Sequence, residues 1–104
     1  MAKLRLSSRK HDGIVTVTVA GELDIATTPD LKSYLRQILV AGPGQVIIDF
    51  SGVSLIDAAG LGALVILRKR AERQHTALLL ADVPASMLRL MILTNLDSHF
   101  DYLP

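Results

Sequence analysis

Apolar patterns of two kinds, one typical of strands and one typical of helices, follow one another along the chain. In residues 14–20, Val15, Val17 and Val19 alternate with threonines, which predicts a strand with one buried face. Residues 46–50 and 77–81 are short apolar runs bounded by turn residues, which predicts two further buried strands. Because helical patterns separate these strands, the order favours a mostly parallel sheet with crossover helices.

Two weaker strand signals lie at the ends of the chain. Residues 3–8 also alternate, and His11-Asp12-Gly13 is a turn signal, so a hairpin with the valine strand is expected. Residues 100–103 predict a final edge strand. The full prediction is an α/β fold with the order β-β-α-β-α-β-α-β.

Three helices are expected between the strands. Thr27 or Thr28 can cap the first, which carries an apolar stripe at helical spacing and ends at residues 41–44. Asp57 stands where an N-cap belongs, before a helix over residues 58–74, and Pro84 opens a third helix that reaches residue 93. Residues 51–56 are predicted to form a loop, and so are residues 22–26.

Composition limits the classes of protein that this chain can be. With 104 residues, of which 50% are hydrophobic, the chain predicts one compact domain over residues 1–104. The absence of cysteine excludes disulfides and cysteine–zinc sites, and a net charge of +1 does not point to nucleic acid. The first ten residues lack an apolar signal-peptide core, and the longest apolar run, 58–67, is too short to cross a bilayer. We therefore expect a cytoplasmic protein without membrane insertion.

Two segments carry a family resemblance. Residues 21–31 read Gly-Glu-Leu-Asp-Ile-Ala-Thr-Thr-Pro-Asp-Leu, and residues 46–64 contain a strand followed by Asp57-Ala-Ala-Gly-Leu-Gly62 at the start of a helix. With the Val83-Pro84 helix start and the order of elements, they resemble the STAS domain family, in its bacterial anti-sigma factor antagonist form. The resemblance implies the STAS fold, a protein-binding role, no enzymatic activity and no cofactor.

The resemblance also implies a partner and a switch. Antagonists of this type bind an anti-sigma factor that is a serine kinase of the histidine-kinase-like ATPase fold, and this releases a sigma factor. The kinase phosphorylates the residue before Gly-Leu-Gly, which is Ala59 here, and alanine has no hydroxyl group. Whether that alanine is natural or engineered stays open. The implied partner-binding residues are Glu22, Asp24, Ser54, Asp57, Ala58, Ala59, Gly60, Leu61 and Gly62.

Other functions remain open at the level of the sequence. Ala59 is equally compatible with a non-switching STAS subunit of a larger assembly, either a stressosome-like scaffold or a cytosolic accessory subunit of a lipid or anion transporter. The third helix carries more apolar residues than one face can bury, which leaves a homodimer open. Gly60 and Gly62 are a weak signal for a nucleotide, because no third glycine or lysine follows them.

Several of these residues also have simpler interpretations. Helix capping alone explains Asp57, and a loop carboxylate such as Asp24 is often only solvated. The basic run Arg68-Lys69-Arg70 lies near a helix C-terminus and lacks aromatic neighbours, so we expect a solvated face and no nucleic-acid partner. The three histidines show no metal-ligand spacing, so no metal site is expected.

Overall fold

The computed structural model describes residues 4–104, and the order of its elements is the predicted β-β-α-β-α-β-α-β. A short 3-10 helix, Asp97–His99, precedes the last strand and was not predicted. The strands and helices are β1 (Arg5–His11), β2 (Ile14–Leu23), α1 (Thr28–Val40), β3 (Gln45–Ile56), α2 (Ala58–Arg73), β4 (Ala77–Ala81), α3 (Ala85–Leu93) and β5 (Asp101–Tyr102).

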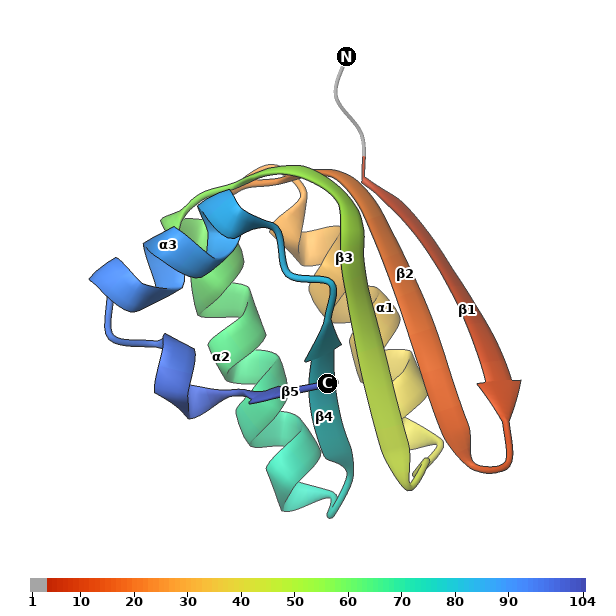
Figure 1. The fold of residues 1–104 in the computed structure, drawn as a ribbon. Coiled ribbons are helices and arrows are strands. Elements are labelled where there is room, and N and C mark those ends of the chain that lie inside the picture. The colour runs from red at the N-terminus through yellow and green to blue at the C-terminus, as the bar shows by residue number, and fades with distance from the viewer. Residues whose placement is uncertain (1–3) are drawn as a thin grey trace.

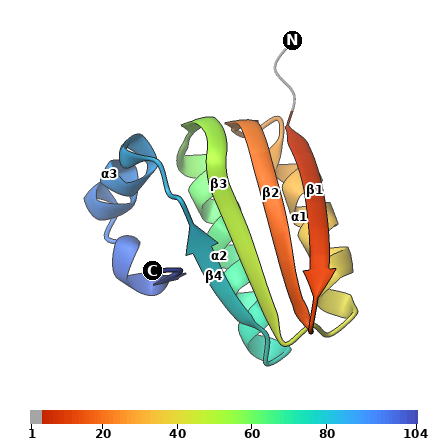
Figure 2. The same ribbon diagram turned by 45° about the vertical axis from the view of Figure 1, so that its right-hand side comes forward.

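The strands form one sheet in the order β1-β2-β3-β4-β5. Only β1 and β2 pair antiparallel; β2–β3, β3–β4 and β4–β5 are all parallel pairs. Helices α1 and α2 cover the same face of the sheet, and α3 lies beyond its β4 side (Figures 1 and 2). The mostly parallel sheet with crossover helices is therefore confirmed.

The core lies between this sheet and its helices. Val17 and Val19 of β2 are fully buried against helix residues such as Leu35 and Leu64, as the alternating pattern predicted. Residues of the opposite face, such as Thr16 and Ile47, are half-buried. Because no helix in residues 4–104 covers the opposite face, strand residues alternate in burial even over residues 46–50 of β3, where only Asp49 is polar.

The loop predicted over residues 51–56 was wrong, because β3 continues through it to Ile56. This segment pairs with the end of β2, from Ala20 opposite Gly52 to Leu23 opposite Ile56, with one register shift before Ala20 and a second after Gly21. A Cβ on Gly52 would lie 2.8 Å from the Cβ of Ala20, so the glycine permits close packing of the two strands. For the same reason β2 reaches Leu23, and Glu22 lies in a strand rather than in the predicted loop.

The hairpin is confirmed, with its turn shifted by one residue. Strand β1 continues to His11, and the turn is Asp12-Gly13, with φ of +52° and +77°. Positive φ at both central residues is the signature of the turn that matches strand twist in two-residue hairpins. Residue 3, where this strand was predicted to begin, lies outside the described residues.

The C-terminal elements lie close to their predicted positions. Pro84 is the N-cap of α3, and the last strand is shorter than predicted because Phe100 turns into the core. In residues 4–104, none of the helices has both the length and the apolar character needed to cross a membrane.

Candidate functional site

The predicted site residues converge on one end of the sheet. Strands β2 and β3 run parallel and end side by side, with Leu23 opposite Ile56. The loop before α1 follows β2, and α2 follows β3 directly, so both connections start at the same end of the sheet (Figure 1). We call this region the α2 surface; it comprises Glu22, Asp24, Ile25, Ser54, Leu55, Asp57, Ala58, Ala59 and Gly62.

Asp57 caps α2 as predicted. Its backbone is extended, and its Oδ1 atom accepts a hydrogen bond of 3.0 Å from the backbone N–H of Gly60. The Asp57 N–H donates in turn to the carbonyl of Leu23 at 3.2 Å, which ties the start of the helix to the end of β2. The cap satisfies one of the free amides at the helix N-terminus and fixes where the helix begins.

The two glycines of α2 have different environments. A Cβ on Gly60 would lie 2.8 Å from the Leu23 carbonyl oxygen and 2.8 Å from Cγ1 of Ile56, so only glycine fits there. A Cβ on Gly62 would meet nothing within 4 Å, and this residue is exposed. Close packing of α2 on the sheet therefore requires a glycine at position 60 and not at position 62.

The residues around the predicted phosphoacceptor position differ in exposure. Ala58 is exposed and Ala59 is half-buried, and both lie in the first turn of α2. Leu61, which we predicted to contact a partner, is 1% exposed and belongs to the core, and Gly60 is buried beside it. Both residues therefore lie on the side of α2 that faces the sheet, where helical periodicity places every third or fourth residue.

Asp24 organises the loop that precedes α1. Its Oδ1 atom accepts hydrogen bonds from the backbone N–H groups of Ala26 at 2.9 Å and Thr27 at 3.1 Å. The Thr27 hydroxyl donates to the carbonyl of Glu22 at 2.8 Å and accepts from the Asp24 N–H at 3.0 Å. Thr27 is the N-cap residue of α1, but its side chain closes this loop instead of capping the helix as predicted.

Two large apolar side chains of the α2 surface were not among the predicted site residues. Ile25 is 77% exposed at the tip of the Asp24 loop, and Leu55 is 49% exposed near the end of β3. Beside Leu55, the Ser54 hydroxyl donates to the carbonyl of Gly21 at 3.3 Å. Both residues lie in segments that the sequence predicted as loops, 22–26 and 51–56, but neither was named as a contact residue, because an isoleucine or leucine is more often buried.

The α2 surface combines three carboxylates, two exposed apolar side chains and the N-terminal end of a helix. Across residues 4–104, no three histidine, aspartate or glutamate side chains come together in a way that could hold a metal ion. Apolar side chains flanked by charged groups are the usual composition of a protein-binding surface. The geometry therefore favours contact with another macromolecule.

Comparison with known proteins agrees with this arrangement. An anti-sigma-B factor antagonist of Staphylococcus epidermidis is 31% identical over 93 residues, which are 89% of this chain and 86% of that protein. The crystal structure of an anti-sigma factor antagonist from Mycobacterium paratuberculosis superposes with a TM-score of 0.87 at 25% identity, covering 98% of this chain and 86% of that one. SpoIIAA, a Bacillus cell fate determinant, was solved in its phosphorylated form and shares the fold, with a TM-score of 0.72, 17% identity, and 97% and 91% coverage.

The family model of the STAS domain matches residues 5–103, from the first residue of β1 to the residue after β5. The match includes the whole sheet, its helices and the α2 surface. The chain therefore belongs to the STAS domain family.

Proposed function

We propose that this protein is a cytoplasmic anti-sigma factor antagonist that acts by binding and not by catalysis. Its partner is an anti-sigma factor of the serine-kinase type, with a histidine-kinase-like ATPase fold, and binding releases a sigma factor. The names of the similar proteins from Staphylococcus epidermidis and Mycobacterium paratuberculosis support this role. The exposed Ile25 and Leu55, beside Asp24 and Asp57, supply the contact surface.

The observation that carries the proposal is the position of Ala59. It follows the N-cap Asp57 by two residues and is partly accessible, so a partner that seats on the first turn of α2 touches it. A phosphate there would add about 1.5 to 2 negative charges close to Asp57, which would repel an interface built around these carboxylates. Alanine cannot accept a phosphoryl group, so this surface stays in its binding-competent form.

Affinity capture with a charged variant tests the proposal. The parent protein and Ala59→Glu are immobilised, exposed to lysate of the host, and their partners are identified by mass spectrometry. We expect the parent to retain a kinase-like anti-sigma factor and Ala59→Glu to retain it about tenfold less, equivalent to about 1.4 kcal/mol of binding. The added carboxylate lies in the first turn of a helix, where negative charge is favourable, so the variant should stay folded.

Ala77→Glu is the matched control. Ala77 is exposed and is the first residue of β4. It lies at the end of the sheet opposite the start of α2, so the same substitution leaves the α2 surface unchanged. It should retain the anti-sigma factor as the parent does. The proposal would be contradicted if Ala59→Glu retained the anti-sigma factor as well as the parent does. Capture of transporter or scaffold subunits instead of an anti-sigma factor would also contradict it.

A second candidate is a non-switching STAS subunit of a larger assembly, a stressosome-like scaffold or an accessory subunit of a lipid or anion transporter. The observation that favours it is the apolar side of α3, where Leu88, Ile92 and Leu93 are exposed by 38%, 53% and 75%. Size-exclusion chromatography of native lysate separates the two candidates. Elution with large complexes supports the assembly subunit, and elution only in small complexes supports the antagonist.

A further inference from the structure

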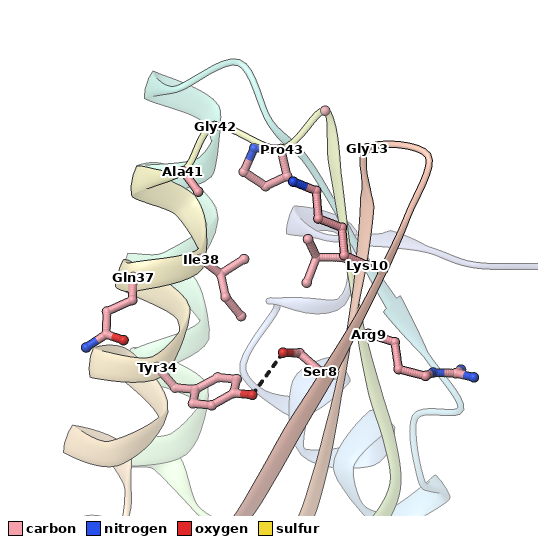
Figure 3. A pocket seen from close by; sticks show the side chains of 12 residues that line it. Ser8, Arg9, Lys10, Gly13, Tyr34, Gln37, Ile38, Ala41, Gly42 and Pro43 are labelled. Atoms are coloured by element: carbon pink, nitrogen blue, oxygen red, sulfur yellow. Dashed lines mark hydrogen bonds between the residues drawn. The ribbon is translucent and has the colours of Figure 1, made fainter.

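A concave site lies at the end of the sheet opposite the α2 surface. It is a cavity of about 500 Å³ between the β1–β2 hairpin and the C-terminal half of α1 (Figure 3). Its volume falls within the range of small-molecule sites. The cavity is reached from the amino end of β3, so it is separate from the α2 surface at the carboxyl ends of β2 and β3. The residues that define its chemistry are Ser8, Lys10, Val15, Tyr34, Ile38 and Pro43.

Hydrogen bonds between distant segments hold the walls of the cavity in place. The backbone N–H of Gly44 donates to the carbonyl of Gly13 at 3.1 Å, which joins the hairpin turn to the loop after α1. The buried Thr76 hydroxyl donates to the Pro43 carbonyl at 2.7 Å and fixes that loop from behind. A cavity with fixed walls does not have to be formed on binding, which lowers the cost of taking up a ligand.

The interior of the cavity has an apolar floor and a polar rim. Val15 and Pro43 are buried and Ile38 is half-buried, so a ligand placed there would remove their remaining apolar surface from water. At the rim the Tyr34 hydroxyl donates to Oγ of Ser8 at 3.0 Å (Figure 3). Oγ of Ser8 acts as the acceptor in that bond, so the Ser8 proton can be donated to a ligand.

The charge at the rim is positive. Lys10 lines the cavity, its side chain extends toward Pro43, and neither ion pair in residues 4–104 involves it (Figure 3). None of the residues that line the cavity in the described part of the chain is an aspartate or glutamate. A lysine ammonium is a donor that matches an anionic oxygen, and the Ser8 hydroxyl supplies a further donor beside Tyr34, at another part of the rim (Figure 3).

We propose that this cavity is a binding site for a small amphipathic carboxylate. The apolar part of the ligand lies against Val15, Ile38 and Pro43. Its carboxylate accepts a hydrogen bond from the Lys10 ammonium at the rim. This site is independent of the α2 surface and of the partner proposed for it.

Titration of the ¹⁵N-labelled protein with octanoate, followed by amide chemical shifts, tests the proposal. We expect shifts confined to the amides that surround the cavity, among them Ser8, Ile38 and Gly42. Lys10→Gln should weaken octanoate binding about threefold, because an exposed charge pair contributes little more than this. Ala41→Trp, at an exposed position on the cavity wall, should abolish the shifts by filling the space.

Two controls make the result specific. Lys69→Gln removes an exposed lysine of α2 that does not line the cavity, and should bind octanoate as the parent does. Octanol has the same chain without the carboxylate and should bind several-fold more weakly. The proposal is overturned if octanoate causes no shifts or shifts far from the cavity. It is also overturned if octanol binds as tightly as octanoate, or if Lys10→Gln lowers stability and leaves octanoate affinity unchanged.

Discussion

The backbone of Gly60 in α2 lies against the carbonyl oxygen of Leu23 in β2, so closely that a Cβ on the glycine would be 2.8 Å from that oxygen. The N–H of the same glycine donates to the Asp57 carboxylate at 3.0 Å. One residue therefore sets both the distance of α2 from the sheet and the start of the helix. The first turn of α2, with Ala58, Ala59 and Gly62, is presented from that fixed base.

Alanine substitutions at the two glycines of α2 should have opposite effects on stability. Gly60→Ala forces a methyl group against the backbone of β2 and should lower the free energy of unfolding by about 1–3 kcal/mol. Gly62→Ala enters open space in an exposed helix and should raise it by about 0.5–1 kcal/mol. Urea denaturation measures both. Similar values for the two variants would show that the contact at Gly60 is not tight.

The hydroxyl of Thr27 should matter more for stability than that of Thr28, although both threonines are buried. Thr27→Val removes the bond to the Glu22 carbonyl and leaves the Asp24 N–H without its acceptor, which should cost about 1–3 kcal/mol. The Thr28 hydroxyl has one bond, to Ile25, at a long 3.5 Å. Thr28→Val is therefore the matched control and should cost less than half as much in the same urea titration.

Ala59→Ser should create a phosphoacceptor. The new hydroxyl would stand two residues after the N-cap Asp57, at the partly accessible position that the sequence resemblance implies for the acceptor. With the captured anti-sigma factor kinase and ATP, we expect one phosphate per chain, seen as a mass increase in intact-protein mass spectrometry. The parent and the neighbouring variant Ala58→Ser should stay unmodified. Phosphorylation of the parent protein would mean that another hydroxyl is the acceptor.

Tyr102 should give the protein a pH-dependent stability in the alkaline range. Burial, and secondarily the negative charge of Asp97, raise the pKa of the Tyr102 phenol above its ordinary value of 10.0. Its hydroxyl also donates to the Asp97 carbonyl at 2.7 Å, a bond that only the neutral phenol can donate. A raised pKa means that the folded state holds the proton more tightly than the unfolded state. The resulting stabilisation is complete below about pH 10 and is lost as pH rises through the folded pKa.

Urea midpoints measured on either side of pH 10 check this expectation. The parent should lose more stability on alkalinisation than Tyr102→Phe, which has no phenol at that position. If Tyr102→Phe shows the same loss as the parent, the phenol of Tyr102 is not its source.

The order of the elements could be read from the sequence because the signals that specify it are local. The alternation of Val15, Val17 and Val19 reports a strand with one buried face whatever lies beside it. Asp57 before an apolar helical run indicates a capped helix by the geometry of a single turn. The motif around Ala59 belongs to the same contiguous stretch, so the position of the candidate site was also predicted.

What the sequence could not decide depended on neighbours from elsewhere in the chain. Residues 51–56 were predicted to form a loop and instead form a strand because β2 offers them a hydrogen-bonding partner. Thr27 closes a loop instead of capping a helix because the Glu22 carbonyl lies within reach. The exposure of Ile25, the burial of Leu61 and the cavity between β1 and α1 likewise exist only once distant segments pack together. Local periodicity determines which element forms, whereas contacts across the fold decide where it ends and which side chains face solvent.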